Sequence, residues 1–356
     1  MLKLEQPKSL KLGFYPYTYV RTSVMKSLLF NKDDYHKMLK MSFSEIAKFL
    51  QESSYKKEIN ALATDYSGAD LLELSLIRSL AESFKKLIRI SPEELSLLIK
   101  EYAKRKDIDD LKTILRGKFT NSDEKTIISS ITGAGSLKYE YLLSLMKKES
   151  AEEVLKNNKL VDFSLFNEAI KEMKEKNSLV AIENVFDKYY YGHLIMFSRL
   201  LPKEGALFRS FISKEVEILN ILTILRLKRA RFRKEDARDY IIYSGDKLRD
   251  SKITSLANLE DLGEVAKALE RTEYKEVVAK GIEEFRKSGS LIALEIGLYK
   301  HLLKQSILLL HQHPLSVDVI LGYMFAKDIE VRNLKIIIKG KQLGLSEEFI
   351  ENQLVF

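Results

Sequence analysis

Apolar residues recur every three or four positions along most of the chain, as on the buried face of an amphipathic helix. A representative stretch consists of Leu72, Leu76, Leu80, Phe84 and Leu87. The alternation typical of strands is limited to the segment YPYTY at residues 15–19. Only five prolines and 15 glycines interrupt the helical pattern. The sequence therefore predicts an all-α, or at least mainly α, protein.

One nine-residue pattern occurs three times along the chain. The copies read DLKTILRGK from Asp110, NILTILRLK from Asn220 and NLKIIIKGK from Asn333, at offsets of 110 and 113 residues. Other residues recur in nearly the same register. They are Glu73, Glu183 and Glu295, then Pro92, Pro202 and Pro314, and finally Asp107, Glu217 and Glu330. This shared register argues against chance similarity between helices rich in Lys and Leu. It predicts three similar helical domains, 1–119, 120–234 and 235–356.

A weaker match links residues 45–57 to residues 264–276 and so relates the first domain to the third. The segment from Ser91 to Glu94 predicts where a helix begins. Ser91 is a candidate cap, Pro92 suits the first helical position, and the two carboxylates that follow favour the positive end of the helix dipole. Each domain is expected to contain one helix with the repeated glutamate, a proline break, a second helix and a third helix that carries the repeated pattern.

The repeated pattern has an apolar face at helical spacing, which predicts a core stripe in each copy. The three stripes are Ile108, Leu111, Ile114 and Leu115; Ile218, Ile221, Ile224 and Leu225; and Val331, Leu334, Ile337 and Ile338. Asp110, Asn220 and Asn333 fall at the edge of the stripe. We interpret them as hydrogen-bonded anchors for a neighbouring helix, with a phosphate site as the alternative.

Basic residues point away from these stripes and are candidates for contact with partners. Residues 226–234, RLKRARFRK, form the densest basic run, which suits an anionic membrane surface, RNA or a solvated junction between domains. The candidate partner-contacting residues are Lys112, Arg116, Arg226, Lys228, Arg229, Arg231, Lys335 and Lys339. The overall excess of 59 Lys and Arg over 51 Asp and Glu is modest and gives a net charge of +8, so nucleic-acid binding is not expected.

Composition narrows the possibilities further. The chain has no cysteine, which removes disulfides and thiolate metal sites. The first residues lack the apolar core and cleavage site of a secretory signal, and the longest apolar runs are shorter than the roughly 18 to 20 residues of a membrane span. We therefore expect a soluble protein inside the cell.

Motifs that would carry chemistry are missing from the sequence. No P-loop pattern, metalloprotease motif or nucleophile elbow occurs, and the glycine-rich GAGS at residues 133–136 suits a turn. His311 and His313 diverge on a helix and lack a carboxylate partner. In KYYYGHL, residues 188–194, at least one tyrosine is expected in the core. We accordingly expect no catalytic, metal or cofactor site.

Three blocks of sequence carry a resemblance to a known family. They are YPYTYVRTSVMKSLL near the start, the pair DIDDLKTILRGK and EVEILNILTILRLKR, and residues 314–355 near the end. Together they resemble the C subunits of the central stalk in archaeal and bacterial A/V-type ATP synthases, which are the counterparts of the d subunit in the eukaryotic vacuolar proton pump. The middle copy departs from the other two at Leu227, where they have glycine.

The resemblance implies three helical domains around a pseudo-threefold axis, forming a funnel on the cytoplasmic face of the membrane. Its broad end would cap the proteolipid ring, and its recess would receive the tip of the shaft formed by the D and F subunits. A protein of this kind is not an enzyme and transmits torque. Because exposed ion pairs are worth only about 0 to 1 kcal/mol each, we expect apolar helix ends to hold the shaft and basic residues to steer docking. A basic helical scaffold that binds nucleic acid is the alternative.

Overall fold

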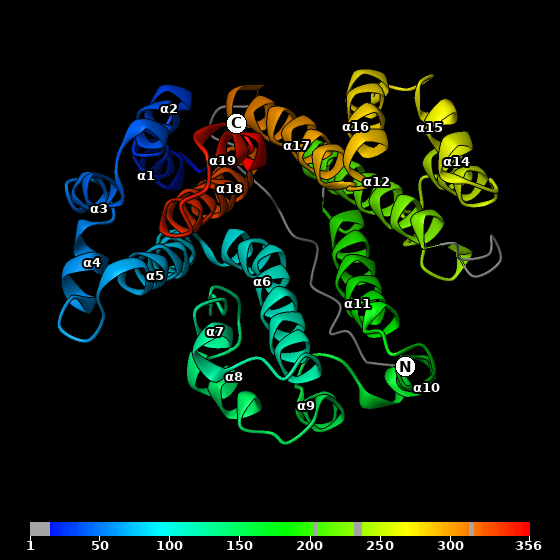
Figure 1. Cartoon of the computed structure of the whole chain (residues 1–356), viewed down its shortest axis with the longest axis horizontal. Helices are drawn as coiled ribbons and strands as arrows, with labels where there is room; N and C mark the ends of the chain where they lie inside the picture. Colours follow the sequence, from blue (N-terminus) through cyan, green and yellow to red (C-terminus); the bar gives the residue numbers. More distant parts are fainter. Residues whose placement is uncertain (1–14, 202–204, 231–236, 313–316) are drawn as a thin grey trace.

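The computed structural model describes residues 15–201, 205–230, 237–312 and 317–356. Every regular element within these ranges is helical, as Figure 1 shows, which confirms the all-α prediction. The possible strand at YPYTY is wrong, because α1 (Pro16–Lys26) begins inside this segment. Pro16 fixes a backbone angle that suits the first turn of a helix, and this local preference overrides the alternation of the tyrosines.

Three long helical hairpins dominate the structure, one in each predicted domain. They are α5 (Gly68–Ile90) with α6 (Glu93–Phe119), α11 (Val180–Arg199) with α12 (Ala206–Arg229), and α17 (Ile292–Gln312) with α18 (Val317–Gln342). Shorter helices precede, connect and follow these hairpins. They are α2 (Lys32–Lys40), α3 (Phe43–Gln51), α4 (Lys56–Leu62), α7 (Glu124–Ile128), α8 (Tyr139–Met146), α9 (Ala151–Asn157), the 3-10 helix η1 (Phe163–Phe166), α10 (Asn167–Lys176), α14 (Lys247–Ala257), α15 (Leu262–Leu269), α16 (Lys275–Ser288) and α19 (Glu347–Gln353).

The proline break of the first hairpin lies where the sequence predicts it. α5 ends at Ile90 and α6 begins at Glu93, with Pro92 as the residue before its first turn. The predicted cap at Ser91 is wrong, because its hydroxyl donates a 2.7 Å hydrogen bond back to the Leu87 carbonyl and so closes α5 instead. Of the equivalent prolines, Pro202 and Pro314 lie outside the described residues.

The predicted core stripes are confirmed in all three copies. Every residue of the three stripes is at least 96% buried. These residues join one continuous core that also contains the predicted α5 face. Because each stripe faces inward, the polar edge of the same helix lies at a fixed position relative to its neighbours.

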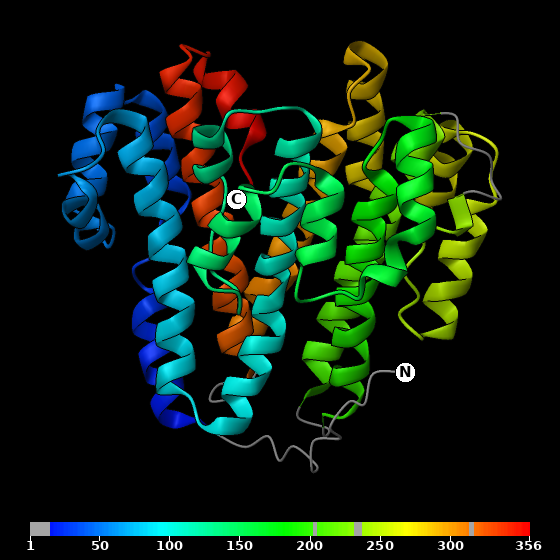
Figure 2. The ribbon, with the colours of Figure 1, turned by 90° about the horizontal axis from the view of Figure 1, so that it is seen from below.

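The long helices pack against one another in a closed circle of contacts. Within hairpins, α5 packs on α6, α11 on α12 and α17 on α18; between hairpins, α6 packs on α11, α12 on α17 and α18 on α5. In each pair between hairpins the helices run antiparallel, since residues near the ends of α6, α12 and α18 meet residues near the starts of α11, α17 and α5. The C-terminal ends of α5, α11 and α17 and the starts of α6, α12 and α18 therefore lie at one end, which we call the turn end, and Figure 2 shows it at the bottom of that view. The opposite end, with the C-termini of α6, α12 and α18, is the cap end.

The polar edge residues act as anchors, as predicted, although their partners differ from the prediction. Asn220 binds the Ile242 backbone, with Nδ2 2.8 Å from O and Oδ1 2.9 Å from N, and Asn333 binds Val355 in the same way. Each partner lies 22 residues further along the chain. Asp110 accepts from the backbone N–H groups of Thr132 and Gly133. All these partners lie in non-helical segments, so the predicted anchoring of a neighbouring helix is wrong in that detail.

Glycine at the repeated pattern permits a close crossing of helices. A Cβ on Gly117 would lie 2.4 Å from Ile127 in α7, and a Cβ on Gly340 would lie 2.5 Å from Ile350 in α19. Ile127 and Ile350 hold equivalent positions, ten residues after each glycine. The two glycines therefore make room for the short helix that follows α6 and α18.

Candidate partner-binding site

A cavity of about 380 Å³ lies between α6, α11, α12 and α17. α6 contributes a stripe of side chains at helical spacing, from Arg105 to Arg116, and α12 contributes a second stripe from Glu215 to Arg226. Apolar side chains, including Ile218, Leu222 and Leu302, separate the charged groups. The cavity is thus an amphipathic chamber built by four of the six long helices.

The floor of the cavity is formed by an ion pair between Arg105 and Glu215. Glu215 is 97% buried, and burial raises its pKa, while Arg105 and Tyr191 act in the opposite direction. Below the floor, toward the turn end, aromatic rings fill the space. Tyr102 meets Phe208 edge to face at 6.3 Å, and Phe211 meets Phe325 at 5.5 Å. These rings close the cavity on the side of the turn end.

The rim of the cavity lies at the cap end and is much more exposed than the floor. The Arg116 side chain is 58% exposed, the Arg226 side chain is 52% exposed, and the Arg105 side chain is only 18% exposed. Between floor and rim, Lys112 pairs with Asp187, whose pKa is raised by burial and lowered in part by Lys112. The chamber is therefore blind at one end and open at the other.

Two series of residues that recur in the sequence pair with one another in the structure. Arg116 of the first hairpin binds Glu183 of the second through Nε–Oε1 and Nη2–Oε2 distances of 2.6 and 2.7 Å. Arg226 of the second binds Glu295 of the third at 2.5 Å. Lys339 of the third lies 3.4 Å from Glu73 of the first. Each basic residue thus reaches the glutamate of the next hairpin, and the third pair returns to the first hairpin.

A buried polar cluster joins the first third of the chain to the last. Glu330 of α18 accepts hydrogen bonds from the Tyr55 hydroxyl at 2.6 Å, the Phe30 backbone at 2.6 Å and Lys327 at 2.8 Å. Lys327 also lies 4.1 Å from the centre of the Tyr55 ring. Tyr55, Lys327 and Glu330 are all at least 96% buried. A satisfied network of this kind fixes one arrangement of the helices that carry it.

The candidate partner-contacting residues are distributed unevenly. Arg116, Arg226 and Lys339 lie in the pairs between hairpins, and Lys112 lies on the cavity wall. Lys335 donates to the Ser129 carbonyl at 3.2 Å, and Lys228 is buried, so neither is freely exposed. Arg229 is exposed. Arg231 lies outside the described residues. Contact of any of them with a partner stays a prediction.

Sequence analysis missed Arg105 and Glu215, although a signal was present. The offsets of 110 and 113 residues relate Arg105 to Glu215 and then to Asp328. These three equivalent positions carry one positive and two negative charges. They therefore predict a cluster of oppositely charged side chains at the place where the three repeated helices come together. Asp328 does lie nearby, paired with Lys106 at 2.8 Å.

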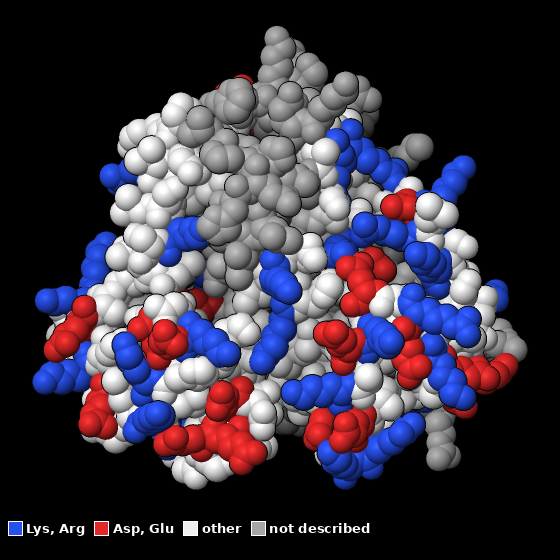
Figure 3. Space-filling view, turned by 90° about the horizontal axis from the view of Figure 1, so that it is seen from above, with Lys and Arg blue, Asp and Glu red and all other residues white. Residues whose placement is uncertain are grey.

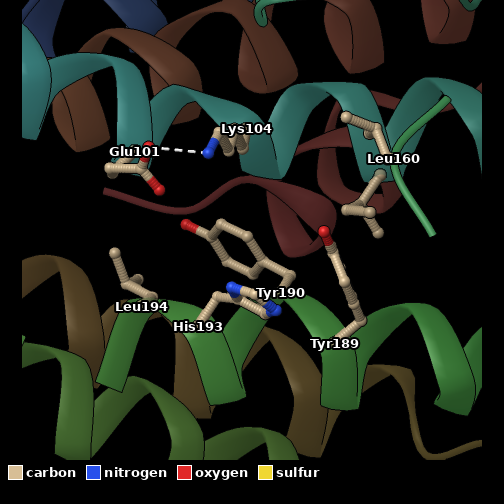
Figure 4. Close-up of a pocket in the computed structure, with 8 residues that line it drawn as sticks. Glu101, Lys104, Leu160, Tyr189, Tyr190, His193 and Leu194 are labelled. Atoms are coloured by element: carbon tan, nitrogen blue, oxygen red, sulfur yellow. Dashed lines mark hydrogen bonds and ion pairs between the residues drawn. The ribbon is translucent and has the colours of Figure 1, made fainter. Parts of the chain in front are cut away.

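A smaller pocket of about 40 Å³ lies between α6 and α11 (Figure 4). Glu101 and Lys104 pair across 2.6 Å on α6, and the rings of Tyr189 and His193 on α11 contact each other with centres 4.4 Å apart and planes tilted by 42°. Burial, followed by Lys104, lowers the pKa of His193. The volume suffices for a few water molecules. Tyr190 and Tyr191 are buried, so the expectation that part of KYYYGHL lies in the core is confirmed.

The turn end carries exposed apolar side chains. α1 belongs to this end because the Thr18 hydroxyl donates to the Ile90 carbonyl at the end of α5. Tyr17 and Val20 of α1 are 64% and 57% exposed, and Met196 and Leu200 at the end of α11 are 52% and 54% exposed. Figure 3 shows charges of both signs mixed over the lower part of that view, which is the side of the cap end.

Membrane spans and metal clusters are both absent from the described part of the chain. No helix in these ranges is long and apolar enough to cross a membrane. Nor do three or more of their His, Asp or Glu side chains cluster in a way that could hold a metal. The side chain of His311 and all of His313 lie outside the described part. GAGS lies in a non-helical segment between α7 and α8, as predicted.

Comparison with known proteins matches nearly the whole chain to one family. Residues 18–353 match the model of the ATP synthase (C/AC39) subunit. The chain belongs to this family. Curated relatives include the C subunit of the A-type ATP synthase of Methanococcoides burtonii, 38% identical over 96% of this chain and 94% of the relative. The namesakes from Methanosarcina barkeri and Haloferax volcanii are 36% and 30% identical, and cover 96% and 95% of this chain and 92% and 97% of their own lengths.

Proposed function

We propose that the chain is a non-catalytic central-stalk subunit of an A-type ATP synthase, acting as a socket between the rotating shaft and the proteolipid ring. The observation that carries the proposal is the cavity, which is blind at its aromatic floor and open at its charged rim. Its form suits the end of a rod-like partner. The relatives' name supplies the complex in which such a partner would be found.

In this proposal the end of the shaft, formed by the D and F subunits, enters the cavity from the cap end. The charges of the rim steer the shaft, and apolar wall residues such as Leu222 and Leu302 hold it. The hairpins form three similar domains around a pseudo-threefold axis and give the funnel its wall. The pairs from Arg116 to Glu183, Arg226 to Glu295 and Lys339 to Glu73 follow this rotation and support it.

The turn end faces the proteolipid ring on the cytoplasmic side of the membrane. Its exposed Tyr17, Val20, Met196 and Leu200 give it an apolar surface that suits contact with a partner or with the membrane surface. Torque then passes from the shaft through the packed core of the long helices to the ring. No chemical step takes place on this protein.

Reconstitution tests the proposal. The purified chain is mixed with the D–F shaft of the same organism and, separately, with detergent-solubilised proteolipid ring. We expect it to bind both. Because Val20 and Met196 are exposed, Val20→Asp with Met196→Asp should abolish ring binding and leave shaft binding and the fold intact. Failure of the wild-type chain to bind either partner contradicts the proposal.

A further inference from the structure

The cavity floor contains a buried carboxylate oxygen that lacks a partner. Arg105 Nη1 binds Glu215 Oε1, and the Tyr191 hydroxyl lies near enough to this carboxylate to lower its pKa as a hydrogen-bond donor, but Glu215 Oε2 is inaccessible to solvent and has no close hydrogen bond among the described residues. Leaving such an acceptor unpaired destabilises the folded state. A buried group of this kind is unusual in a native structure and points to a missing partner.

The charges around the floor leave one negative charge in excess. Arg105 and Lys106 supply two positive charges, whereas Asp109, Glu215 and Asp328 supply three negative charges. Lys106 is already shared between Asp109 at 3.1 Å and Asp328 at 2.8 Å. The floor therefore favours an additional cation.

The walls above the floor restrict the form of that cation. Ile108, Ile218, Leu219 and Leu302 line the cavity together with the charged groups, so an apolar stem is accommodated there. One turn of helix, about 10 Å wide and 5.4 Å long, fills roughly 400 Å³. A cavity of about 380 Å³ is therefore large enough for the end of a helix.

We propose that the cavity recognises a lysine or arginine at the tip of the incoming shaft, whose cationic head binds Glu215 Oε2. The proposal rests on the proposed function for the identity of the guest. The long apolar stem of a lysine or arginine passes the isoleucine and leucine side chains, and its head reaches the one acceptor that the described part of the floor leaves unpaired. Arg105 holds Glu215 in place, and its positive charge also reduces the electrostatic attraction between Glu215 and a second cation.

Two substitutions at the floor should change shaft binding in opposite directions. Glu215→Gln removes the acceptor charge and leaves Arg105 to repel the guest, so shaft affinity should fall by about tenfold or more. Arg105→Gln removes the competing cation, so affinity should rise by about threefold or more. Glu283→Gln, at the surface of α16, is the control and should leave affinity unchanged. Isothermal titration of purified D–F shaft into each variant measures all three.

The outcomes separate the inference from the proposed function. If the shaft binds wild type and Glu215→Gln equally, or if both floor variants lose affinity, the inference is overturned and the socket function stands. If wild type does not bind the shaft, the socket function fails, and a second measurement decides the inference alone. This second measurement is thermal unfolding with added ethylguanidinium. Ethylguanidinium should raise the melting temperature of wild type saturably but not that of Glu215→Gln, and neutral ethylurea should affect neither protein. Equal effects of ethylguanidinium on wild type and variant would overturn the inference.

Discussion

α6 and α18 are copies of one helix in different surroundings. α18 packs on α5, α17, α1, α3, α12 and α19, and its Lys327 and Glu330 are buried in one side-chain network with Tyr55. α6 presents a stripe from Arg105 to Arg116 to the cavity. The comparison shows that one repeated apolar face is compatible with two different polar faces, of which one closes the circle of helices and the other borders the open chamber.

The difference follows from the position of each helix in the chain. α6 meets the next hairpin, whereas α18 must return to the first one, and Glu330 binds residues 275 and 300 positions away. Closing a longer loop costs more conformational entropy. The junction of α18 with α5 offsets that cost with a dense apolar contact and the buried cluster of Tyr55, Lys327 and Glu330.

The largest effect is expected at this closing junction. Glu330→Ala removes the acceptor of three donors and leaves Lys327 as an unpaired buried cation, so the free energy of unfolding should fall by about 3 to 5 kcal/mol. The equivalent Asp107→Ala on α6 should cost about 1 to 2 kcal/mol, because it frees backbone N–H groups of Ser136 and Leu137 in a partly exposed loop. Urea denaturation followed by circular dichroism measures both. Equal costs would show that the two helices are not fixed differently.

A second prediction concerns a feature that the two helices share. Gly117→Ala and Gly340→Ala should each cost about 1 to 3 kcal/mol, because the new methyl group meets an isoleucine at 2.4 or 2.5 Å. Gly192→Ala in α11 is the control. Nothing lies within 4 Å of a Cβ at that position, so alanine should stabilise the protein by about 0.5 to 1 kcal/mol. Thermal unfolding of the three variants tests this, and destabilisation by Gly192→Ala would refute the steric explanation.

The repeat explains why much of the fold was predictable. A core stripe is a property of one helix, and its period of 3.6 residues can be recognised in the local sequence. All three stripes were therefore correctly predicted from residues such as Leu111, Leu225 and Leu334. The proline break at Pro92 is equally local. The cap at Ser91 was not predictable in the same way, since its hydroxyl has two competing backbone partners one turn apart.

The site was less predictable because its contacts join different copies. The sequence identified Arg116 and Glu183 as members of two repeated series, but their pairing depends on how the hairpins pack, and no local pattern encodes that. Arg105 and Glu215 were missed for a related reason, because their residue types differ between copies and only the register relates them. The division into domains 1–119, 120–234 and 235–356 stays a prediction. Asp110 reaches across its first boundary to bind Thr132.

A third prediction distinguishes the anchors of the two helices by their response to pH. Burial raises the pKa of Asp110 to about 7 from 3.8, whereas the equivalent Asn333 does not titrate. The raised pKa means that Asp110 stabilises the fold in its protonated form, fully below pH 3.8, and that this contribution is lost as the pH rises to about 7. Asp110→Asn should therefore gain stability relative to wild type by about 1 kcal/mol per pH unit over that range. Urea unfolding of both proteins at several pH values measures the difference, and a constant difference would contradict the prediction.

The smallest effect is expected at the exposed pairs that the two helices make with their neighbours. Arg116→Gln and Lys339→Gln should each reduce the free energy of unfolding by no more than about 1 kcal/mol, because both basic side chains are more than half exposed, and a salt bridge with an exposed member gains little over solvation. The loss should be larger for Arg116→Gln than for Lys339→Gln, because Arg116 makes a bidentate contact to Glu183 whereas Lys339 lies 3.4 Å from Glu73. Double-mutant cycles with Glu183→Gln and Glu73→Gln isolate the two coupling energies. A larger coupling at Lys339 would mean that the closing junction depends on charge at its surface and not on the buried Glu330 cluster.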